Sequence, residues 1–199
     1  SATILMDVGA NVDCTPKHLL HYGIMGVEYA KVILNKQSVS LGLLSIGEEE
    51  SKGNELTKAA FELLKTQLPY FYGNVEGRDI YKCKTDVVVC DGFVGNTILK
   101  VSEGLAETLF GMIRNGINEK LTYKLGAFLL KSFFKNFKKT IDYSEYGGAP
   151  LLGVNGYCII CHGRSSSNAI KNAVRVANNV IEKKINDKIA EQIVKLKLT

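Results

Sequence analysis

The sequence of 199 residues contains no apolar run that approaches the roughly 18 residues of a membrane-spanning helix. It also lacks a leading secretory segment, and its five cysteines are an odd number without the spacing of a disulfide framework. We therefore expect reduced thiols, a cytoplasmic location and a chain that does not cross a membrane. With 46% hydrophobic and 23% charged residues, the composition is that of an ordinary globular protein with a substantial core.

Several catalytic patterns are missing from the sequence as well. There is no G-x-S-x-G segment, no Ser-His-Asp arrangement and no cluster with metal-ligand spacing, so we expect neither a metal nor another cofactor. Residues 158–162 match the C-x-x-C-H haem-attachment pattern, but they lie in an apolar, strand-like run whose alternate side chains face opposite sides. Cys158 and Cys161 are therefore interpreted as structural thiols.

Residues 85–100 predict the central strand of the fold and the helix that follows it. Val87 to Cys90 form an uninterrupted apolar run, which is typical of a central parallel strand covered on both faces. A glycine-bearing turn, Asp91 to Asn96, follows, and apolar residues then recur at helical spacing to about Ile113. Ligands of open α/β sheets bind beyond the carboxyl ends of the strands, at helix N-termini. The turn is thus a candidate site with Asn96 as helix cap and amide donor, or equally a capped turn without a ligand.

Polar segments also follow the other strands that the pattern predicts, over 3–8, 39–46, 70–72 and 157–161. Helices over 16–33, 56–64 and 168–193 alternate with these strands. The polar segments, DVGAN, GEEESKGNE, GNVEGRD and CHGRSS, would meet DGFVGN at one edge of a parallel sheet. Each can also be a solvated turn; Arg78, for example, suits a bound phosphate or an ion pair with Glu76 or Asp79. Their accumulation favours a site that binds an anion and stabilises developing negative charge without a covalent nucleophile.

The stretch from Lys120 to Ile141 contains no Asp or Glu and carries six lysines, so its charge of +6 exceeds the +5 of the whole chain. We expect a helix over 121–141, with five of these lysines in one sector and a broad apolar arc around the rest. Two explanations rank first: packing against a subunit partner, or attachment to an anionic membrane surface. A core helix with a solvated edge is the third. A glycine-rich loop over 142–155 follows, and Ser165 to Ser167 are expected to cap the last helix.

Six segments of the sequence are recognisable together: DVGANVDCTPKHL, IGEEESKGNELTKAAFELLK, GNVEGRDI, TDVVVCDGFVGNTILK, DYSEYGGAPLLGVNG and HGRSSSNAIKNA. In this order they resemble the phosphate acyltransferase family of bacterial phospholipid synthesis, whose members make acyl phosphate from acyl-acyl carrier protein and inorganic phosphate. The resemblance implies a three-layer α/β/α sandwich with a mostly parallel sheet, related to phosphotransacetylase and to isocitrate-dehydrogenase-like folds. It also implies a homodimer that is peripherally attached to the inner face of the cell membrane.

Members of that family carry an N-terminal region with its own glycine-rich strand end. Residues 1–199 are therefore expected to be the C-terminal portion of a single α/β acyltransferase domain, and the strand that begins at Thr3 agrees with an upstream portion. Residues 114–141 correspond to the protruding basic helical segment of the family. Cys158 and Cys161 stand where the family has aliphatic or small residues, which again favours a packing role.

On this interpretation the site residues fall into groups by role. The catalytic residues are Lys52, Asn96 and His162. Phosphate or substrate is bound by Gly53, Asn54, Arg78, Gly92, Gly95, Arg164 and Ser165. Supporting positions are Asp7, Asn11, Glu48, Glu49, Asn74, Glu76 and Asp91. Membrane or dimer contacts are expected from Lys124, Phe128, Lys131, Phe134 and Lys135.

The expected partners are acyl carrier protein, inorganic phosphate, an anionic membrane surface and a second copy of the chain. Nucleic acid is not among them. Residues 92–95 match the GxxG loop of a nucleic-acid-binding KH domain, but they follow a strand and the lysines lie elsewhere in the sequence. Two alternatives stay open: a non-catalytic anion-binding or membrane-adaptor domain on the same fold, and a phosphotransacylase for short acyl-CoA.

Overall fold

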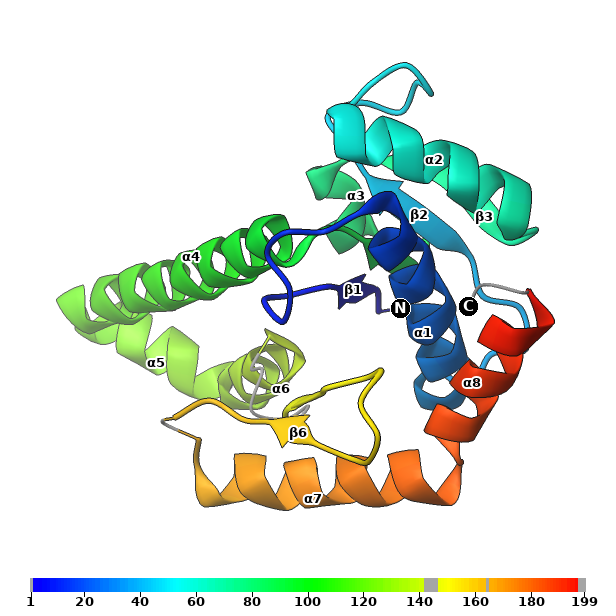
Figure 1. The fold of residues 1–199 in the computed structure, drawn as a ribbon. Coiled ribbons are helices and arrows are strands. Elements are labelled where there is room, and N and C mark those ends of the chain that lie inside the picture. Colours follow the sequence, from blue (N-terminus) through cyan, green and yellow to red (C-terminus); the bar gives the residue numbers. More distant parts are fainter. Residues whose placement is uncertain (1, 142–146, 164, 197–199) are drawn as a thin grey trace. The chain divides into compact units, whose positions relative to one another are not determined.

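The structure is a computed structural model that describes residues 2–141, 147–163 and 165–196 (Figure 1). The chain forms two compact units. Unit 1 comprises Ser1–Thr97, Leu151–Tyr157 and Val180–Thr199, and unit 2 comprises Ile98–Pro150 and Cys158–Asn179.

Unit 1 is built on a four-stranded parallel sheet. Its strands are β1 (Ile4–Met6), β2 (Leu41–Leu44), β3 (Phe71–Val75) and β4 (Val87–Val89), in the spatial order β1-β4-β2-β3. The β4 strand pairs in parallel with β1 on one side and β2 on the other. All three of its valines are buried. The prediction of a central, two-sided strand at 87–90 is therefore confirmed.

Helices α1 (Pro16–Ile33), α2 (Glu55–Gln67) and α8 (Ile185–Lys195) form a layer on this sheet. The α1 helix packs on β1 and β4, and α2 packs on β2 and β3, while α1 also contacts α2 and α8. Close approach of α1 depends on glycine, because a Cβ at Gly23 would lie 2.7 Å from the Leu41 Cδ2 atom. The parallel sheet and its helices agree with the three-layer α/β/α class predicted from the sequence. The short α3 helix (Gly77–Lys82) connects β3 to β4.

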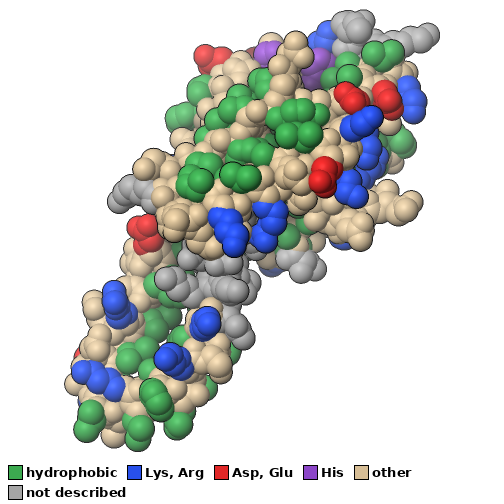
Figure 2. Space-filling model, turned by 90° about the horizontal axis from the view of Figure 1, so that it is seen from below, with side chains coloured by type: hydrophobic (Ala, Val, Ile, Leu, Met, Phe, Trp, Pro, Cys, Tyr) green, Lys and Arg blue, Asp and Glu red, His purple; other side chains and the backbone are tan. Residues whose placement is uncertain are grey.

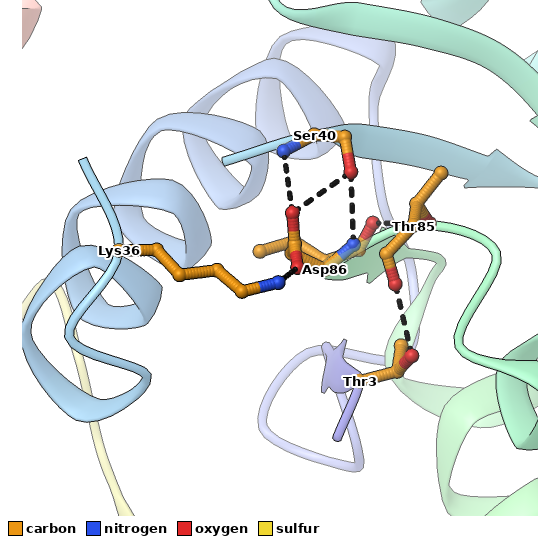
Figure 3. A network of polar contacts seen from close by, with 6 residues as sticks. Thr3, Lys36, Ser40, Thr85 and Asp86 are labelled. Carbon is orange, nitrogen blue, oxygen red and sulfur yellow. Dashed lines mark hydrogen bonds and ion pairs between the residues drawn. The ribbon is translucent and has the colours of Figure 1, made fainter. Parts of the chain in front are cut away.

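A polar network joins the amino ends of three strands (Figure 3). The Asp86 carboxylate accepts hydrogen bonds from the Ser40 backbone N–H at 3.0 Å and the Ser40 hydroxyl at 2.9 Å, and it pairs with the Lys36 ammonium. The Thr3 hydroxyl donates to the Thr85 carbonyl at 2.9 Å. Burial acts to raise the pKa of Asp86, but Lys36 and Ser40 outweigh burial, so this pKa lies below its usual value. The network lies at the end of the sheet opposite the predicted site.

Unit 2 is mainly helical. It contains most of α4 (Gly92–Glu119), all of α5 (Leu121–Leu129) and α6 (Lys131–Ile141), and most of α7 (Ser167–Glu182). A separate two-stranded antiparallel sheet joins β5 (Ala149–Pro150) to β6 (Ile159–Ile160). Figure 2 shows hydrophobic side chains exposed among Lys and Arg side chains where α4 and α5 meet. Among the described residues, no helix is both long enough and apolar enough to span a membrane.

Two predicted helices are wrong in their extent. The helix expected over 121–141 is divided at Leu130, which places Phe137 of α6 against Phe110 of α4 with ring centroids 5.8 Å apart. The helix expected over 168–193 is divided near Lys184, which has a left-handed φ of 50°. This break lets α8 bury Ile185 and Ile189 in unit 1, where α8 packs on α1. In both cases tertiary packing overrides a periodic pattern that continues along the chain.

The expected placement of the 157–161 strand is also wrong. Only Ile159 and Ile160 are extended, and they pair with β5 rather than with the parallel sheet. The polar segment that begins at His162 therefore does not follow a strand of that sheet. The polar segments after β1, β2, β3 and β4 do leave the same edge of the parallel sheet, as predicted.

Candidate functional site

The turn after β1 is organised by the carboxylate of Asp7, which is 7% exposed. Its Oδ1 atom accepts hydrogen bonds from the backbone N–H groups of Gly9 and Ala10, both at 2.8 Å, and its Oδ2 atom accepts one from Asn11 at 2.7 Å. Gly9 has a φ of +131°, which a residue with a side chain rarely adopts. Asp7 therefore holds the 7–11 turn in a fixed shape.

The turn after β4 is joined directly to this first turn. The Gly92 backbone N–H donates to the Asn11 carbonyl at 2.9 Å, and a Cβ at Gly92 would lie 2.5 Å from the same oxygen. Asn96 lies next to Gly9, because a Cβ at Gly9 would be 3.5 Å from the Asn96 Cβ atom. The structure thus brings the exposed amide of Asn96 to the edge of the sheet, against the turn that Asp7 organises.

The local start of α4 differs from the sequence prediction. The helix begins at Gly92, so Asn96 lies within its second turn, and the prediction that Asn96 caps the helix is wrong. Asp91 takes that place, since its Oδ1 atom accepts a hydrogen bond from the Val94 N–H at 2.8 Å. Burial, with added effects of the Asp91 and Asp7 carboxylates, raises the pKa of the Cys90 thiol. A thiol in this environment is a poor nucleophile.

The segment after β2, residues 45–54, bears Lys52 and leads into α2. Asn54 is the N-cap of α2, because its Oδ1 atom accepts from the Thr57 N–H at 2.9 Å. Gly53 has a φ of +114°, and a Cβ there would lie 2.1 Å from the Thr57 hydroxyl oxygen. Lys52 is exposed. Because β2 and β4 are parallel neighbours, the segments that bear Lys52 and Asn96 leave the same edge of the sheet.

Asn74 supports the Lys52 segment from the neighbouring strand. It is the fourth residue of β3 and not part of the following turn, so the predicted end of that strand at Tyr72 is wrong. Its Nδ2 atom donates to the Glu49 carbonyl at 2.9 Å, and the same carbonyl accepts the Lys52 backbone N–H at 3.0 Å. The side chain is 3% exposed. Asn74 thereby fixes the bend that carries Lys52.

Ion pairs occupy several of the charged groups around this edge. Arg78 pairs with Glu76 at 2.8 Å, which is the structural alternative considered for this arginine. Lys84 pairs with Glu48 at 2.7 Å, and this hydrogen bond raises the pKa of Lys84. The backbone N–H of Glu76 donates to Asp79 and lowers the pKa of Asp79. These contacts hold the turn after β3 in place.

The residues predicted near the last helix lie in unit 2. His162 is exposed, and its backbone carbonyl accepts the Ser165 N–H at 2.9 Å. Ser166 caps α7 through its hydroxyl oxygen, which accepts from the Ala169 N–H at 3.2 Å, so the predicted serine cap is confirmed. Arg164 lies outside the described residues, as do 142–146 of the predicted glycine-rich loop.

The edge of the sheet in unit 1 thus offers a lysine, an amide and helix N-terminal N–H groups. Such groups bind anions and stabilise oxyanions. Across the part of the chain that the structure describes, no three His, Cys, Asp or Glu side chains gather in a way that could hold a metal ion.

The sequence matches known proteins along nearly its whole length. The model of a family described as "Fatty acid synthesis protein" matches residues 1–188. The chain belongs to this family. It is 57% identical to a phosphate acyltransferase of Thermodesulfovibrio yellowstonii over 190 residues, which are 96% of the chain and 55% of the relative. Identity to proteins of the same name is 54% over 187 residues in Wolinella succinogenes and 52% over 191 residues in Geobacter sulfurreducens.

Coverage of these relatives is partial. The three matches take in 94%, 96% and 96% of this chain, and only 55 to 56% of each relative. The chain therefore spans a little over half the length of the phosphate acyltransferases that it matches.

Sequence reasoning missed His18 as a residue that shapes the site. Its Nδ1 atom lies 3.2 Å from the Asn11 Nδ2 atom and accepts the Thr15 N–H at 3.1 Å. Thr15 and His18 form a capping box at the start of α1. The usual sequence pattern of such a box is Glu or Gln three residues after Ser or Thr. A histidine in that position does not match the pattern, so the capping box was not predicted.

Proposed function

We propose that this chain belongs to an enzyme that transfers a fatty acyl group from acyl-acyl carrier protein to inorganic phosphate, giving acyl phosphate for phospholipid synthesis. The observation that carries the proposal is the arrangement of Lys52 and Asn96 on segments that leave neighbouring parallel strands at one edge of the sheet. Membership of the fatty acid synthesis protein family and relatives named phosphate acyltransferase support it.

In this reaction the protein must position phosphate and the thioester and stabilise the negative charge that develops on the carbonyl oxygen. Phosphate is largely ionised near pH 7, as the second pKa of about 6 of a phosphomonoester indicates, so its oxygen attacks the thioester carbonyl without a strong base. The new oxygen–carbon bond forms, the carbon–sulfur bond breaks, and the thiolate leaves as carrier-protein thiol after it takes a proton. Lys52, with the backbone of Gly53 and Asn54, holds phosphate charge, and the Asn96 amide donates to the carbonyl oxygen as it becomes negative.

The remaining predicted residues have supporting parts in this proposal. His162 orients phosphate or protonates the leaving thiolate, and Arg164 and Ser165 add to the binding of the anion. Gly92 and Gly95 let backbone approach closely. Asp7, Asn11 and Asp91 hold the turns after β1 and β4, and Glu48, Glu49 and Glu76 hold those after β2 and β3. Arg78 is paired with Glu76, which favours a structural part for it over direct phosphate binding.

We further propose that α5 and α6 attach the protein to the cytoplasmic face of an anionic membrane or to a second copy of the chain. Apolar side chains are exposed there next to lysines: Phe128 is 70% exposed and Leu129 is 75% exposed. Lys124, Lys131 and Lys135 are exposed on the same helices. Such a combination suits a headgroup interface, where apolar groups enter the lipid and lysines meet anionic headgroups.

The test is phosphate-dependent release of free carrier-protein thiol from long-chain acyl carrier protein, with the acyl phosphate trapped by hydroxylamine. It is run on this chain, on a form extended upstream, and on the phosphate acyltransferase of T. yellowstonii as positive control. Release by the chain or by its extended form supports the proposal. Silence in both with an active control contradicts it and favours an anion-binding adaptor, and preference for short acyl-CoA would favour phosphotransacylation instead.

A further inference from the structure

Two buried polar atoms beneath the Lys52 segment have no hydrogen-bond partner among the described residues: the Ser45 Oγ atom and the Asn74 Oδ1 atom. The Nδ2 atom of Asn74 donates to the Glu49 carbonyl, which fixes the orientation of the amide. Oδ1 is therefore the amide atom that lacks a hydrogen-bond partner. Natural proteins satisfy most of their buried polar atoms, and an exception often marks a binding or catalytic role.

Both residues lie at the same end of the β2–β3 pair. The Ser45 backbone N–H donates to the Val75 carbonyl at 2.9 Å, so Ser45 follows directly on the paired ends of β2 and β3, where Asn74 pairs with Leu43. The Ser45 Oγ atom would lie 3.1 Å from a Cβ at Gly53, next to the N-terminus of α2. Both side chains therefore form the floor under residues 46–53, the segment that bears Lys52.

The chemistry of this floor is unlike that of its surroundings. The Lys52 ammonium and the N–H groups at the start of α2 are donors, which suit an anion. Asn74 Oδ1 is an acceptor only, and an acceptor among donors repels an anion unless that anion carries a proton. Hydrogen phosphate has both features, with charged oxygens for the donors and one O–H group for an acceptor. Sulfate near neutral pH has the same shape and charge but no proton.

We propose that Ser45 and Asn74 form a subsite for the protonated oxygen of hydrogen phosphate, which selects phosphate over sulfate. The proposal rests on the proposed function, since it names how that substrate is recognised. Residues 46–53 lie over both atoms, since the Asn74 amide donates to the Glu49 carbonyl and the Ser45 hydroxyl lies next to Gly53.

The test is titration calorimetry of the full-length protein with phosphate, arsenate and sulfate, without acyl donor. Arsenate carries a proton near neutral pH, as phosphate does, so both should bind and sulfate should bind at least tenfold more weakly. Ser45→Ala should weaken phosphate and arsenate about tenfold, the usual effect of losing a hydrogen bond to a charged group. Ser51→Ala, at an exposed position of the same segment, is the matched control and should bind like wild type.

Asn74→Leu provides the second variant. It should bind phosphate and sulfate with similar, weak affinity, because the acceptor that reads the proton is gone. Ser45→Ala removes an unpartnered polar atom, so its thermal stability should equal or exceed that of wild type, and its binding result does not depend on whether Asn74→Leu folds. Equal affinity of wild type for phosphate and sulfate, or unchanged phosphate binding by Ser45→Ala, would overturn the subsite. Thiol release in the acyl-transfer assay judges the proposed function separately.

Discussion

The carbonyl oxygen of Asp7 lies so close to Gly95 that a Cβ at position 95 would come within 1.8 Å of it. The first turn of α4 therefore rests directly on the end of β1. The contact also brings the Cys90 thiol to the same carbonyl, to which its Sγ atom donates at 3.5 Å. Two segments more than 80 residues apart in the sequence are held at backbone contact by the absence of a side chain at residue 95.

Gly95→Ala should destabilise the fold by about 2 to 4 kcal/mol, because the neighbouring atoms are backbone and cannot move aside easily. Gly104→Ala in the same helix is the control. Apart from the adjoining residues and backbone of its own helix, no described atom lies within 4 Å of a Cβ at Gly104, so this change should stabilise by about 0.5 to 1 kcal/mol through the better helix propensity of alanine. Urea denaturation of both variants measures the two effects. Equal changes in the free energy of unfolding for Gly95→Ala and Gly104→Ala would contradict the close contact at Gly95.

Asp7→Asn should cost about 1 to 3 kcal/mol of stability, since the buried carboxylate accepts three backbone hydrogen bonds and an amide replaces one acceptor oxygen with a donor. Asp13→Asn, at an exposed position of the same loop, should change stability little. Chemical denaturation at neutral pH separates the two variants. A similar loss in both would show that charge in the loop matters and not the hydrogen bonds of Asp7.

Asp86 should make stability depend on acid pH. Its pKa is lowered in the folded protein, so its contribution is present above the unfolded value of about 3.9 and is lost as pH falls through the lower folded value. Asp86→Asn should lower stability by about 2 kcal/mol at pH 7 and flatten the stability profile below about pH 4. Thermal melts from pH 7 to pH 3 measure the profile. If the stability of the variant fell with pH as steeply as that of wild type, other carboxylates would be the cause of the loss of stability in acid.

The sequence was sufficient to predict the four strands of the parallel sheet and helices α1 and α2, because each of them leaves a strong local pattern. Three consecutive valines at 87–89 predict a doubly covered strand, and Thr15 followed by Pro16 predicts the start of α1; both are confirmed. The site edge followed from the rule that ligands bind at the carboxyl ends of parallel strands. The contacts between turns could not be predicted, since nothing local to Asp7 indicates that Gly95 will pack on it.

The wrong helix lengths and the misplaced strand originate in tertiary packing. Periodic patterns run through Leu130 and Lys184 without interruption, yet both helices end there so that Phe137 and Ile185 can pack elsewhere. The strand near Ile159 was expected in the main sheet because a short apolar run does not reveal its partner. Asn96 was expected as a cap because Asn is a frequent cap residue, but Asp91 precedes it and takes that role.

Lys52→Ala and Asn96→Ala should each lower the rate of phosphate-dependent thiol release by about 10²- to 10³-fold, the typical cost of losing one oxyanion or phosphate donor. Neither side chain is buried, so stability should stay near that of wild type. Lys58→Ala, at an exposed position of α2, is the control and should keep full activity. Rates within a few-fold of wild type in both site variants would show that these residues are not the catalytic donors.

Charge reversal on α5 and α6 should weaken binding to anionic membranes. Each lysine near an anionic surface contributes about 1 kcal/mol, so replacement of Lys124, Lys131 and Lys135 by Glu should reduce binding by roughly a hundredfold or more. A matched variant with Glu at Lys171, Lys183 and Lys188, exposed on or next to α7 and α8, has the same net charge and should bind nearly as wild type. Liposome flotation with anionic and neutral vesicles measures the difference. Equal flotation of all three proteins would show that these lysines do not bind the membrane. Contact with a second copy of the chain would then remain as the explanation of this basic segment, and sedimentation of the same variants would test it.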